Sequence, residues 1–390
     1  MKQKPSIFSV IDLGTYQVKT LIAQKIARDQ IMVLGAGTAQ TEGMKFGVVS
    51  NWEALSQSIR NSVAQAEKTA GKKVSEVTLA VNNYGMVGTT IQSETATSRS
   101  DLQITEMDIE KINIASKEKL RSTIKKDLDN GIVWSAPISY KIDGELNYSD
   151  PLDMVGNKIE TETLFITSKT KHTNDFVRAA EKAGLDIAEV LPSPIAISCI
   201  PQISRVAMRA GAALVNIGYE TTTIMLYQNE IPISFEIFKI GSNDITNDIA
   251  VGLKVSVEEA EKIKLGEIKK FSSPSLDNII RNRVNQILEL IEKHIVKYLG
   301  HRYLPGGLIL TGGGSKIANL DNIVKANLQL PVSIITPVTT SKISIKDQKW
   351  AVAYGLCFYY LFSPNHGGSG RGVWHKMWFW VKSKFHQVMP

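Results

Sequence analysis

Residues 9–23 read SVIDLGTYQVKTLIA, and the pattern of this segment is the strongest indication of the fold. Residues 7–13 and 18–23 are rich in apolar and β-branched side chains, and Gly14-Thr15 stands between them. Two apolar runs separated by a glycine break predict two strands joined by a tight turn. Asp12 lies at the end of the first predicted strand, directly before the turn.

This hairpin opens a longer unit that occurs twice. A third apolar run, 31–35, leads into 51–70, where apolar residues recur at helical spacing. The same order returns later, with apolar runs at 212–217, 222–226 and 231–240, a break at Gly218 and a predicted helix over 242–251. Two units of one pattern predict an α/β chain with two homologous halves.

Two further segments stand outside the repeated pattern. Residues 84–165 are more polar and strand-rich, and we interpret them as an inserted subdomain. Apolar spacing predicts a long helix over 276–298, and a short strand at 308–310 follows it. That strand runs into Thr311-Gly312-Gly313-Gly314-Ser315 and another helical pattern. A strand, a glycine run and a helix in this order are typical of a nucleotide site.

Composition restricts the class of protein. The 390 residues are 43% hydrophobic and 21% charged, which is enough chain for a large core and two or three domains. An apolar run of about 18 residues, which a membrane span requires, is absent, and the N-terminus has no signal-peptide pattern. Cys199 and Cys357 stand in apolar surroundings without metal-ligand spacing, which favours reduced core thiols in the cytosol.

The net charge of +7 is partly a property of the C-terminus, since Asp347 is the last acidic residue. Lys and Arg elsewhere are mixed with nearly equal numbers of acids, as on an ordinary solvated surface. We therefore expect no nucleic-acid partner.

Glycine turns allow backbone N–H groups to approach phosphate oxygens closely. The amides of Gly14, Thr15 and Tyr16 are candidates, 216–224 provides a matching turn in the second half, and 311–315 is a third. Any one of these alone is better explained by an ordinary hairpin turn, but three at corresponding places in two similar halves favour phosphate binding. Neither a P-loop motif nor a complete dinucleotide fingerprint occurs, which disfavours those two nucleotide-binding folds.

The segments with these turns resemble a superfamily that includes actin, sugar kinases and heat-shock chaperone ATPases. Within it they are similar to FtsA, the actin-like family of bacterial cell division. The resemblance involves SVIDLGTYQVKTLIA, GAGTAQTEGMKFGVV, LPSPIAISCI, NIGYETTTIMLY, KIGSNDITNDIA, LILTGGGSKIANL and KWAVAYGLCFYY, in the family's order. It implies duplicated actin-like (ribonuclease H-like) halves around a nucleotide cleft, with the family's distinctive subdomain at 84–165.

The resemblance also implies a site for ATP and Mg. Its cofactor contacts would be Asp12, Gly14, Thr15, Asn216, Gly218, Thr221, Gly241, Glu261, Lys264, Gly312, Gly313, Gly314 and Ser315. Asp12 is the candidate catalytic residue and would hold Mg through a water. Glu261 and Lys264 are one helical turn apart, so both can face the cleft, although an ordinary surface ion pair has the same spacing.

Two departures from the family pattern affect these expectations. The second phosphate loop reads Asn216-Ile217-Gly218-Tyr219-Glu220-Thr221 where the family has Asp-Ile-Gly-Gly-Gly-Thr. Glu220 would bring negative charge toward phosphates, so we expect ATP binding with weak or absent hydrolysis. The stretch 265–274 is shorter than in many members of the resembled family. It belongs to the subdomain that receives the FtsZ tail in that family, so we expect a smaller docking surface here.

The C-terminal residues predict a membrane helix. Residues 363–372, SPNHGGSGRG, have the composition of a flexible linker, and on 373–387 aromatic and apolar residues share one helical face beside basic ones. Such a helix fits an anionic membrane interface, the alternative being that it docks on the protein itself. The expected membrane residues are Arg371, Trp374, Lys376, Met377, Trp378, Trp380, Val381, Lys382, Lys384 and Phe385.

The domain boundaries that we expect follow from these segments. They are 1–83 with 166–204, 84–165, 205–240 with 304–362, 241–303, the linker 363–372 and the helix 373–387. The function implied by the resemblance is a peripheral protein at the cytoplasmic face of the inner membrane at midcell. It would anchor the FtsZ ring through the FtsZ C-terminal tail, self-associate into filaments, bind anionic lipids and recruit later division proteins. A PilM-like pilus scaffold and an ATPase or sugar kinase of the same fold are the alternatives.

Overall fold

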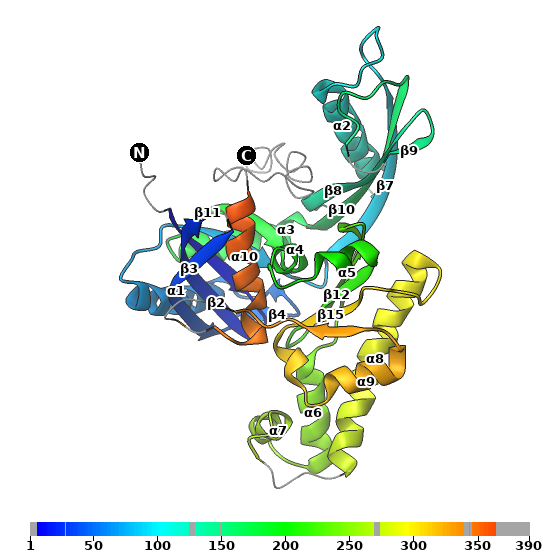
Figure 1. Cartoon of the computed structure of the whole chain (residues 1–390). Helices are drawn as coiled ribbons and strands as arrows, with labels where there is room; N and C mark the ends of the chain where they lie inside the picture. The colour runs from blue at the N-terminus through cyan, green and yellow to red at the C-terminus, as the bar shows by residue number, and fades with distance from the viewer. Residues whose placement is uncertain are drawn as a thin grey trace.

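The computed structural model describes residues 6–27, 29–124, 129–147, 150–268, 274–338, 343 and 345–363. The predicted glycine hairpin lies in the middle of the first sheet (Figure 1), whose described strands run in the order β11-β6-β1-β2-β3. These strands are β1 Ile7–Leu13, β2 Gln17–Ala27, β3 Gln30–Gln40, β6 Glu76–Val81 and β11 Asp186–Pro192. β1 pairs antiparallel with β2 and parallel with β6, and it is buried from Phe8 onward.

Two glycines of β3 allow helix α1, Trp52–Ala70, to pack directly on the strand. A Cβ at Gly35 would lie 2.2 Å from the carbonyl oxygen of Ala66, and one at Gly37 would lie 2.0 Å from that of Ser62. Only residues without a side chain permit this approach. The third strand is longer than the predicted 31–35 because its small residues remain paired with β2 to Gln40.

The second sheet repeats the topology of the first. Its described strands are β12 Ala212–Ile217, β13 Thr222–Gln228, β14 Ile231–Phe238, β15 Gly307–Thr311 and β16 Val332–Ile334, in the order β14-β13-β12-β15-β16. As in the first sheet, the first strand pairs antiparallel with the second and parallel with the fourth. The predicted duplication is therefore present in strand order and direction.

Helices α6 Ser242–Leu253, α7 Val257–Lys264, α8 Pro274–Leu299 and α9 Leu320–Leu328 belong to the second half. α7 lies away from the two central sheets, together with the part of α8 that is nearest to it (Figure 1), whereas the C-terminal half of α8 packs on the second sheet. The guanidinium of Arg283 on α8 holds Asp248 on α6 through two hydrogen bonds of 2.7 and 2.8 Å. The imidazole of His294 joins α8 to β14 by contacts of 2.9 Å with Ser234 and 2.5 Å with Glu236.

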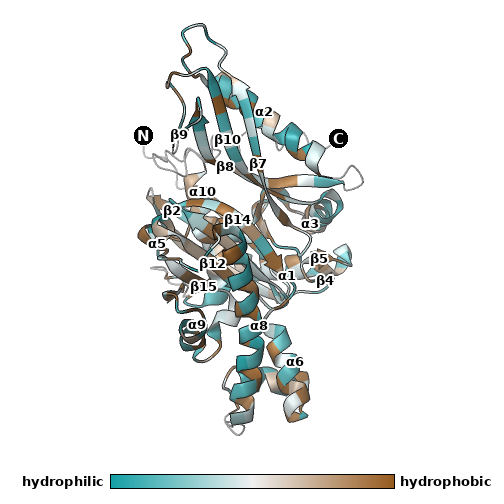
Figure 2. Ribbon diagram, turned by 90° about the vertical axis from the view of Figure 1, so that its right-hand side faces the viewer, coloured by the Kyte–Doolittle hydropathy of each residue, from teal (hydrophilic) through white to brown (hydrophobic). Residues whose placement is uncertain are grey.

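The segment that we interpreted as an insertion forms its own antiparallel sheet. It comprises β7 Val87–Ala96, α2 Glu106–Thr123, β8 Asn130–Ile142, β9 Glu145–Asn147 and β10 Lys158–Lys169, with strand order β7-β10-β8-β9. Ile109 and Ile112 of α2 pack with Tyr140 of β8, and much of the helix is hydrophilic (Figure 2). Gly88 lies close to the second half, since a Cβ there would be 2.5 Å from the carbonyl oxygen of Phe235.

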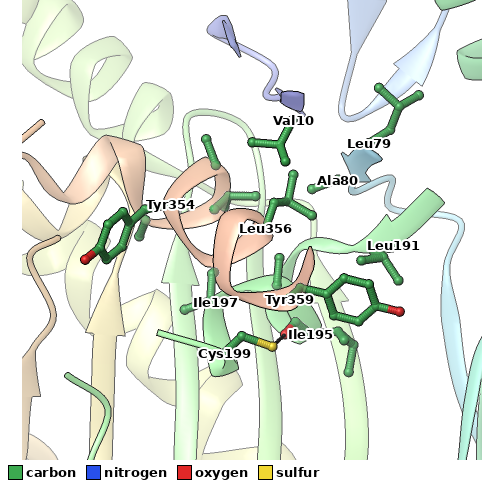
Figure 3. Packing of buried hydrophobic residues seen from close by; sticks show 14 of the residues in the cluster. Val10, Leu79, Ala80, Leu191, Ile195, Ile197, Cys199, Tyr354, Leu356 and Tyr359 are labelled. Atoms are coloured by element: carbon green, nitrogen blue, oxygen red, sulfur yellow. Dashed lines mark hydrogen bonds between the residues drawn. The ribbon is translucent and has the colours of Figure 1, made fainter. Parts of the chain in front are cut away.

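Two helices connect the halves and cross each other. α4, Ser193–Ser198, follows β11 and leads through α5, Arg205–Ala210, to β12, and α10, Ala351–Phe362, returns from the second half to pack against β1. A Cβ at Gly355 of α10 would lie 2.2 Å from the carbonyl oxygen of Ala196. Figure 3 shows the apolar core around this crossing. Cys199 and Cys357 are both buried and unpaired, as predicted.

Among the described helices, none has the length and apolar character that a membrane span requires. Ser363, the first residue of the predicted linker, is buried at the end of α10, and its N–H donates to the Tyr359 carbonyl at 2.9 Å. The rest of the linker and the predicted membrane helix, with all of the membrane residues from Arg371 to Phe385, lie outside the described part of the chain.

Candidate functional site

The first glycine turn places a buried ion pair beside it. Asp12 of β1 and Lys19 of β2 are cross-strand neighbours, and 2.9 Å separates the Lys19 ammonium from the Asp12 carboxylate. Both side chains are at most 10% exposed. The sequence analysis selected Asp12 and missed Lys19, although the register of the predicted hairpin could have identified it.

The turn itself is held by the end of β3. The hydroxyl of Thr41 donates to the carbonyl of Gly14 at 2.6 Å, and the Thr41 N–H donates to that of Tyr16 at 3.0 Å. A Cβ at Gly14 would lie 2.9 Å from the carbonyl oxygen of Gln17, so the tight turn favours glycine. Thr15 is half-buried beside it.

The second glycine turn is closed by a hydrogen bond of 2.9 Å from the Gly218 N–H to the Thr221 carbonyl. It is also attached to the start of α6, because the N–H groups of Ser242 and Asn243 donate to the carbonyls of Gly218 and Tyr219 at 2.9 and 2.8 Å. A Cβ at Gly241 would lie 2.4 Å from the Tyr219 carbonyl oxygen. The predicted residues Gly218, Thr221 and Gly241 thus form one connected structure.

The third turn meets the second at Asn216. A Cβ at Gly312, whose φ is +89°, would lie 2.3 Å from the Asn216 Oδ1, and one at Gly314 would lie 2.4 Å from Ile217 Cγ2. The Ser315 hydroxyl donates to the Gly312 carbonyl at 2.7 Å, so it stabilises the turn. Gly313 differs from these, since it is exposed and a Cβ there would meet no atom within 4 Å.

Glu261 and Lys264 form a polar cluster with α6. The Lys264 ammonium contacts the Glu261 carboxylate at 2.7 Å, the Thr246 hydroxyl at 2.8 Å and the Ser242 carbonyl at 3.1 Å. Burial lowers the pKa of Lys264, with Glu261 acting in the opposite direction. These three contacts use the three N–H donors of the ammonium, so Lys264 positions Glu261, which remains the more exposed partner.

The first and second turns approach one another through aromatic rings. The ring centroids of Tyr16 and Tyr219 lie 4.8 Å apart, with 38° between the ring planes. We name the region between turns 14–16, 218–221 and 312–314 the inter-loop site. The predicted residues at or beside this site come from five chain segments, namely the three turns, the start of α6, and α7.

Glu220 of the second turn contacts the first half of the chain. Its carboxylate accepts the N–H of Phe46 at 2.6 Å, so this oxygen is directed to the β4–β5 hairpin (β4 Met44–Lys45, β5 Val48–Val49). Burial raises the pKa of Glu220, and the Phe46 N–H, Lys45 and Lys239 counteract the shift. No local pattern in the sequence indicates that this hairpin lies near Glu220, because the two are 174 positions apart.

Comparison with known proteins supports this architecture. The family model "Cell division protein FtsA" matches residues 213–355, and the model "SHS2 domain inserted in FTSA" matches residues 85–167. The cell division protein FtsA of Borreliella burgdorferi is 28% identical over 375 residues, covering 90% of this chain and 89% of its own length. FtsA of Bacillus subtilis is 27% identical over 374 residues, with 90% and 82% covered.

Solved structures share the fold at low sequence identity. The PilM-PilN type IV pilus biogenesis complex contains a chain with a TM-score of 0.72 and 17% identity, covering 91% of this chain and 98% of its own. MreB5 of Spiroplasma citri bound to ADP has a TM-score of 0.50 and 14% identity, covering 92% and 97%.

The fold and the paired turns define an actin-like protein with two duplicated halves and an inserted SHS2 subdomain. The two family models together cover more than half of the chain, and the curated relatives match most of its length. The chain belongs to the FtsA family of cell division proteins.

Proposed function

We propose that this chain binds ATP and Mg at the inter-loop site and anchors the FtsZ ring to the cytoplasmic face of the bacterial inner membrane. The observation that carries the nucleotide part is the approach of the first and second turns from opposite halves, seen in the ring contact of Tyr16 with Tyr219. MreB5, with a similar fold, binds ADP, which supports a nucleotide in this fold.

The residues at the inter-loop site fit a nucleotide with a divalent cation. The amides of the Gly14 and Gly218 turns are suited to phosphate, and Lys19 supplies a buried positive charge beside the first turn. Asp12 would hold Mg through a water, and the metal when bound would neutralise phosphate charge. Gly313 offers open space for the adenosine.

Slow turnover follows from the same residues. Asn216 stands where the resembled loop has an acid, and an amide cannot accept a proton as a carboxylate does. Asp12 is already paired with Lys19, and this contact occupies one of its carboxylate oxygens. We therefore expect ATP to act chiefly as a bound ligand that stabilises one arrangement of the two halves.

Several partners complete the proposal. The α6–α8 region would receive the FtsZ C-terminal tail, and the helix at 373–387 would bind anionic lipids as a peripheral anchor at midcell. The insertion would contact later division proteins or the next subunit of a filament. A groove of about 390 Å³ on its sheet is consistent with this role. The groove has a mixed charged lining that includes Glu94, Lys141 and Glu160.

Two measurements test the proposal. Isothermal calorimetry with ATP and Mg should show a single binding event, and no heat above the dilution control would refute the nucleotide part. A peptide of the FtsZ C-terminal tail should bind the full chain, and its binding should be lost when α6–α8 surface residues are changed. A PilM-like pilus scaffold is the weaker alternative, since the curated relatives are FtsA proteins, and tight binding of the FtsZ peptide would exclude it.

A further inference from the structure

Tyr219 and Glu220 occupy the two positions where the resembled loop has glycines, and both side chains reach the opposite half. The ring of Tyr219 contacts the ring of Tyr16 with centroids 4.8 Å apart. The carboxylate of Glu220 accepts the Phe46 N–H at 2.6 Å. Tyr219 and Glu220, which replace two glycines of the resembled loop, therefore each add one contact between the halves.

The β4–β5 hairpin that receives Glu220 is firmly held by the first half. The Tyr84 N–H donates to the Phe46 carbonyl at 3.2 Å. Gly47, with a φ of +74°, lies so close to the segment before the insertion that a Cβ would be 1.9 Å from the Asn82 carbonyl oxygen. Because Glu220 is hydrogen-bonded to this hairpin, it is linked to the first half and to residues 82–84, where the insertion begins.

A third contact between the halves lies beside these. Lys239, which directly follows β14 of the second half, places its ammonium 4.2 Å from the ring centroid of Phe46 and 4.8 Å from that of Tyr84. A lysine ammonium at this distance from an aromatic ring is attracted to the face of the ring. The ammonium also lies near Glu220, whose charge it partly balances.

Tyr219 itself lies within the inter-loop site. Burial raises the pKa of its phenol, and the nearby groups Glu261, Tyr16 and Glu220 raise it further. Its side chain therefore lies near Tyr16 of the first turn and near Glu261 of α7, two places that a bound nucleotide would also approach.

We propose that Tyr219 and Glu220 form a clasp that holds the two halves closed when no nucleotide is bound. Closure of the halves in this protein would then depend on contacts between protein side chains. With a glycine loop in the same place, these contacts would be absent and closure would depend on a bound nucleotide. A nucleotide entering the inter-loop site has to displace the ring of Tyr219. The clasp also connects closure to the insertion, through Phe46 and Tyr84.

The inference rests on the proposed function only for the identity of the displaced ligand, so it is tested without nucleotide. Spin labels at Ala64→Cys on α1 and Lys262→Cys on α7 report the distance between the halves, and the buried native cysteines do not compete for label. The test variant is Tyr219→Gly with Glu220→Gly. The matched control, Tyr219→Phe with Glu220→Gln, keeps a ring and an acceptor.

In the nucleotide-free protein we expect a narrow distance distribution for wild type and control, and a longer, broader one for the glycine variant. Hydrogen exchange at the Phe46 amide should become ~10-fold faster in the glycine variant, because a hydrogen bond to a charged group is lost. Identical distributions and exchange in all three proteins would overturn the clasp. If the glycine variant fails to fold, Tyr16→Ala removes the ring contact from an exposed position of the first half, and an unchanged distribution there refutes the aromatic part.

ATP titration of the same proteins separates the two hypotheses. Failure of wild type to bind ATP would contradict the proposed function and leave the distance measurement valid. If ATP binds, the glycine variant should bind it more tightly than the control, because no ring has to be displaced. Weaker binding by the glycine variant would contradict the clasp as a competitor of the nucleotide.

Discussion

Asp12 and Lys19 face one another from neighbouring strands of the first hairpin, with carboxylate and ammonium 2.9 Å apart and almost no solvent contact. Removal of one partner from a buried pair leaves the other charge uncompensated. We expect Lys19→Met to lower the free energy of unfolding by about 3 kcal/mol, and Asp12→Asn with Lys19→Met to recover most of the loss. Urea denaturation of wild type, the two single variants Lys19→Met and Asp12→Asn, and the double variant gives the coupling. Additive effects would show that the pair is not energetically linked.

Gly313 is the residue of the third turn that can be changed without disturbing the fold, because a Cβ there has open space. Gly313→Asp should abolish ATP binding by placing a carboxylate beside the expected ligand, with an unchanged melting temperature. Gly313→Ala, the matched control, should bind ATP with nearly wild-type affinity. Unchanged affinity of the Asp variant in calorimetry would show that this turn does not contact the nucleotide.

The crossing of α4 and α10 should be sensitive to a single methyl group. A Cβ at Gly355 would lie 2.2 Å from the Ala196 carbonyl oxygen. This oxygen belongs to the backbone, so a side-chain rotation cannot relieve the clash. Gly355→Ala should therefore lower the free energy of unfolding by about 1–3 kcal/mol through overpacking. In Gly131→Ala, where the nearest atom is the Thr170 hydroxyl at 3.3 Å, the loss should be much smaller. Equal stability of both variants would argue against close packing at the crossing.

Glu189 predicts a dependence of stability on pH. A bulge in β11 places this residue under α10, where the Tyr359 hydroxyl donates to its carboxyl at 2.7 Å. Burial raises the pKa of Glu189 to about 7, from an ordinary value of 4.5. The folded chain then binds more protons than the unfolded one between these values, so stability falls as the pH rises from 4.5 through 7.

Glu189→Gln removes that dependence and keeps an acceptor for Tyr359. It should match wild type below pH 4.5 and exceed its unfolding free energy by roughly 3 kcal/mol above pH 7, at about 1.4 kcal/mol per pKa unit. Glu181→Gln, at an exposed position of α3 (Thr170–Lys182), is the control and should change neither value. A pH-independent difference between Glu189→Gln and wild type would contradict the raised pKa.

The C-terminal helix is expected to bind membranes through its tryptophans. Each basic residue near an anionic surface contributes about 1 kcal/mol, so the few lysines and one arginine of the segment bind weakly by themselves. Trp378→Glu with Trp380→Glu should release the protein from anionic liposomes and leave ATP binding intact. Salt should weaken attachment only in part, since burial of the rings is not screened. Undiminished co-sedimentation of the double variant would indicate that the helix docks on protein instead.

The sequence predicted most of the fold, because its signals are local. Apolar runs interrupted by Gly14 and Gly218 gave both hairpins, and the repeated order gave the matching strand directions of the two sheets. Lys19 follows from the register of the first hairpin, so a closer interpretation could have found it. The hydrogen bond between Glu220 and Phe46 could not be predicted, because it joins residues 174 positions apart and depends on how the halves pack.

The crossing at Gly355 has a mechanical meaning for the protein as a whole. Both chain passages between the halves meet there, so rotation of one half on the other would pivot about this point, and the turns farther away would travel most. α10 also ends beside the first sheet, where Tyr360 stacks on Phe8 with ring centroids 4.0 Å apart. Whatever follows Ser363 is thus attached near the pivot. If the chain is anchored to a membrane beyond Ser363, as we propose, the attachment point would move little when the two halves rotate.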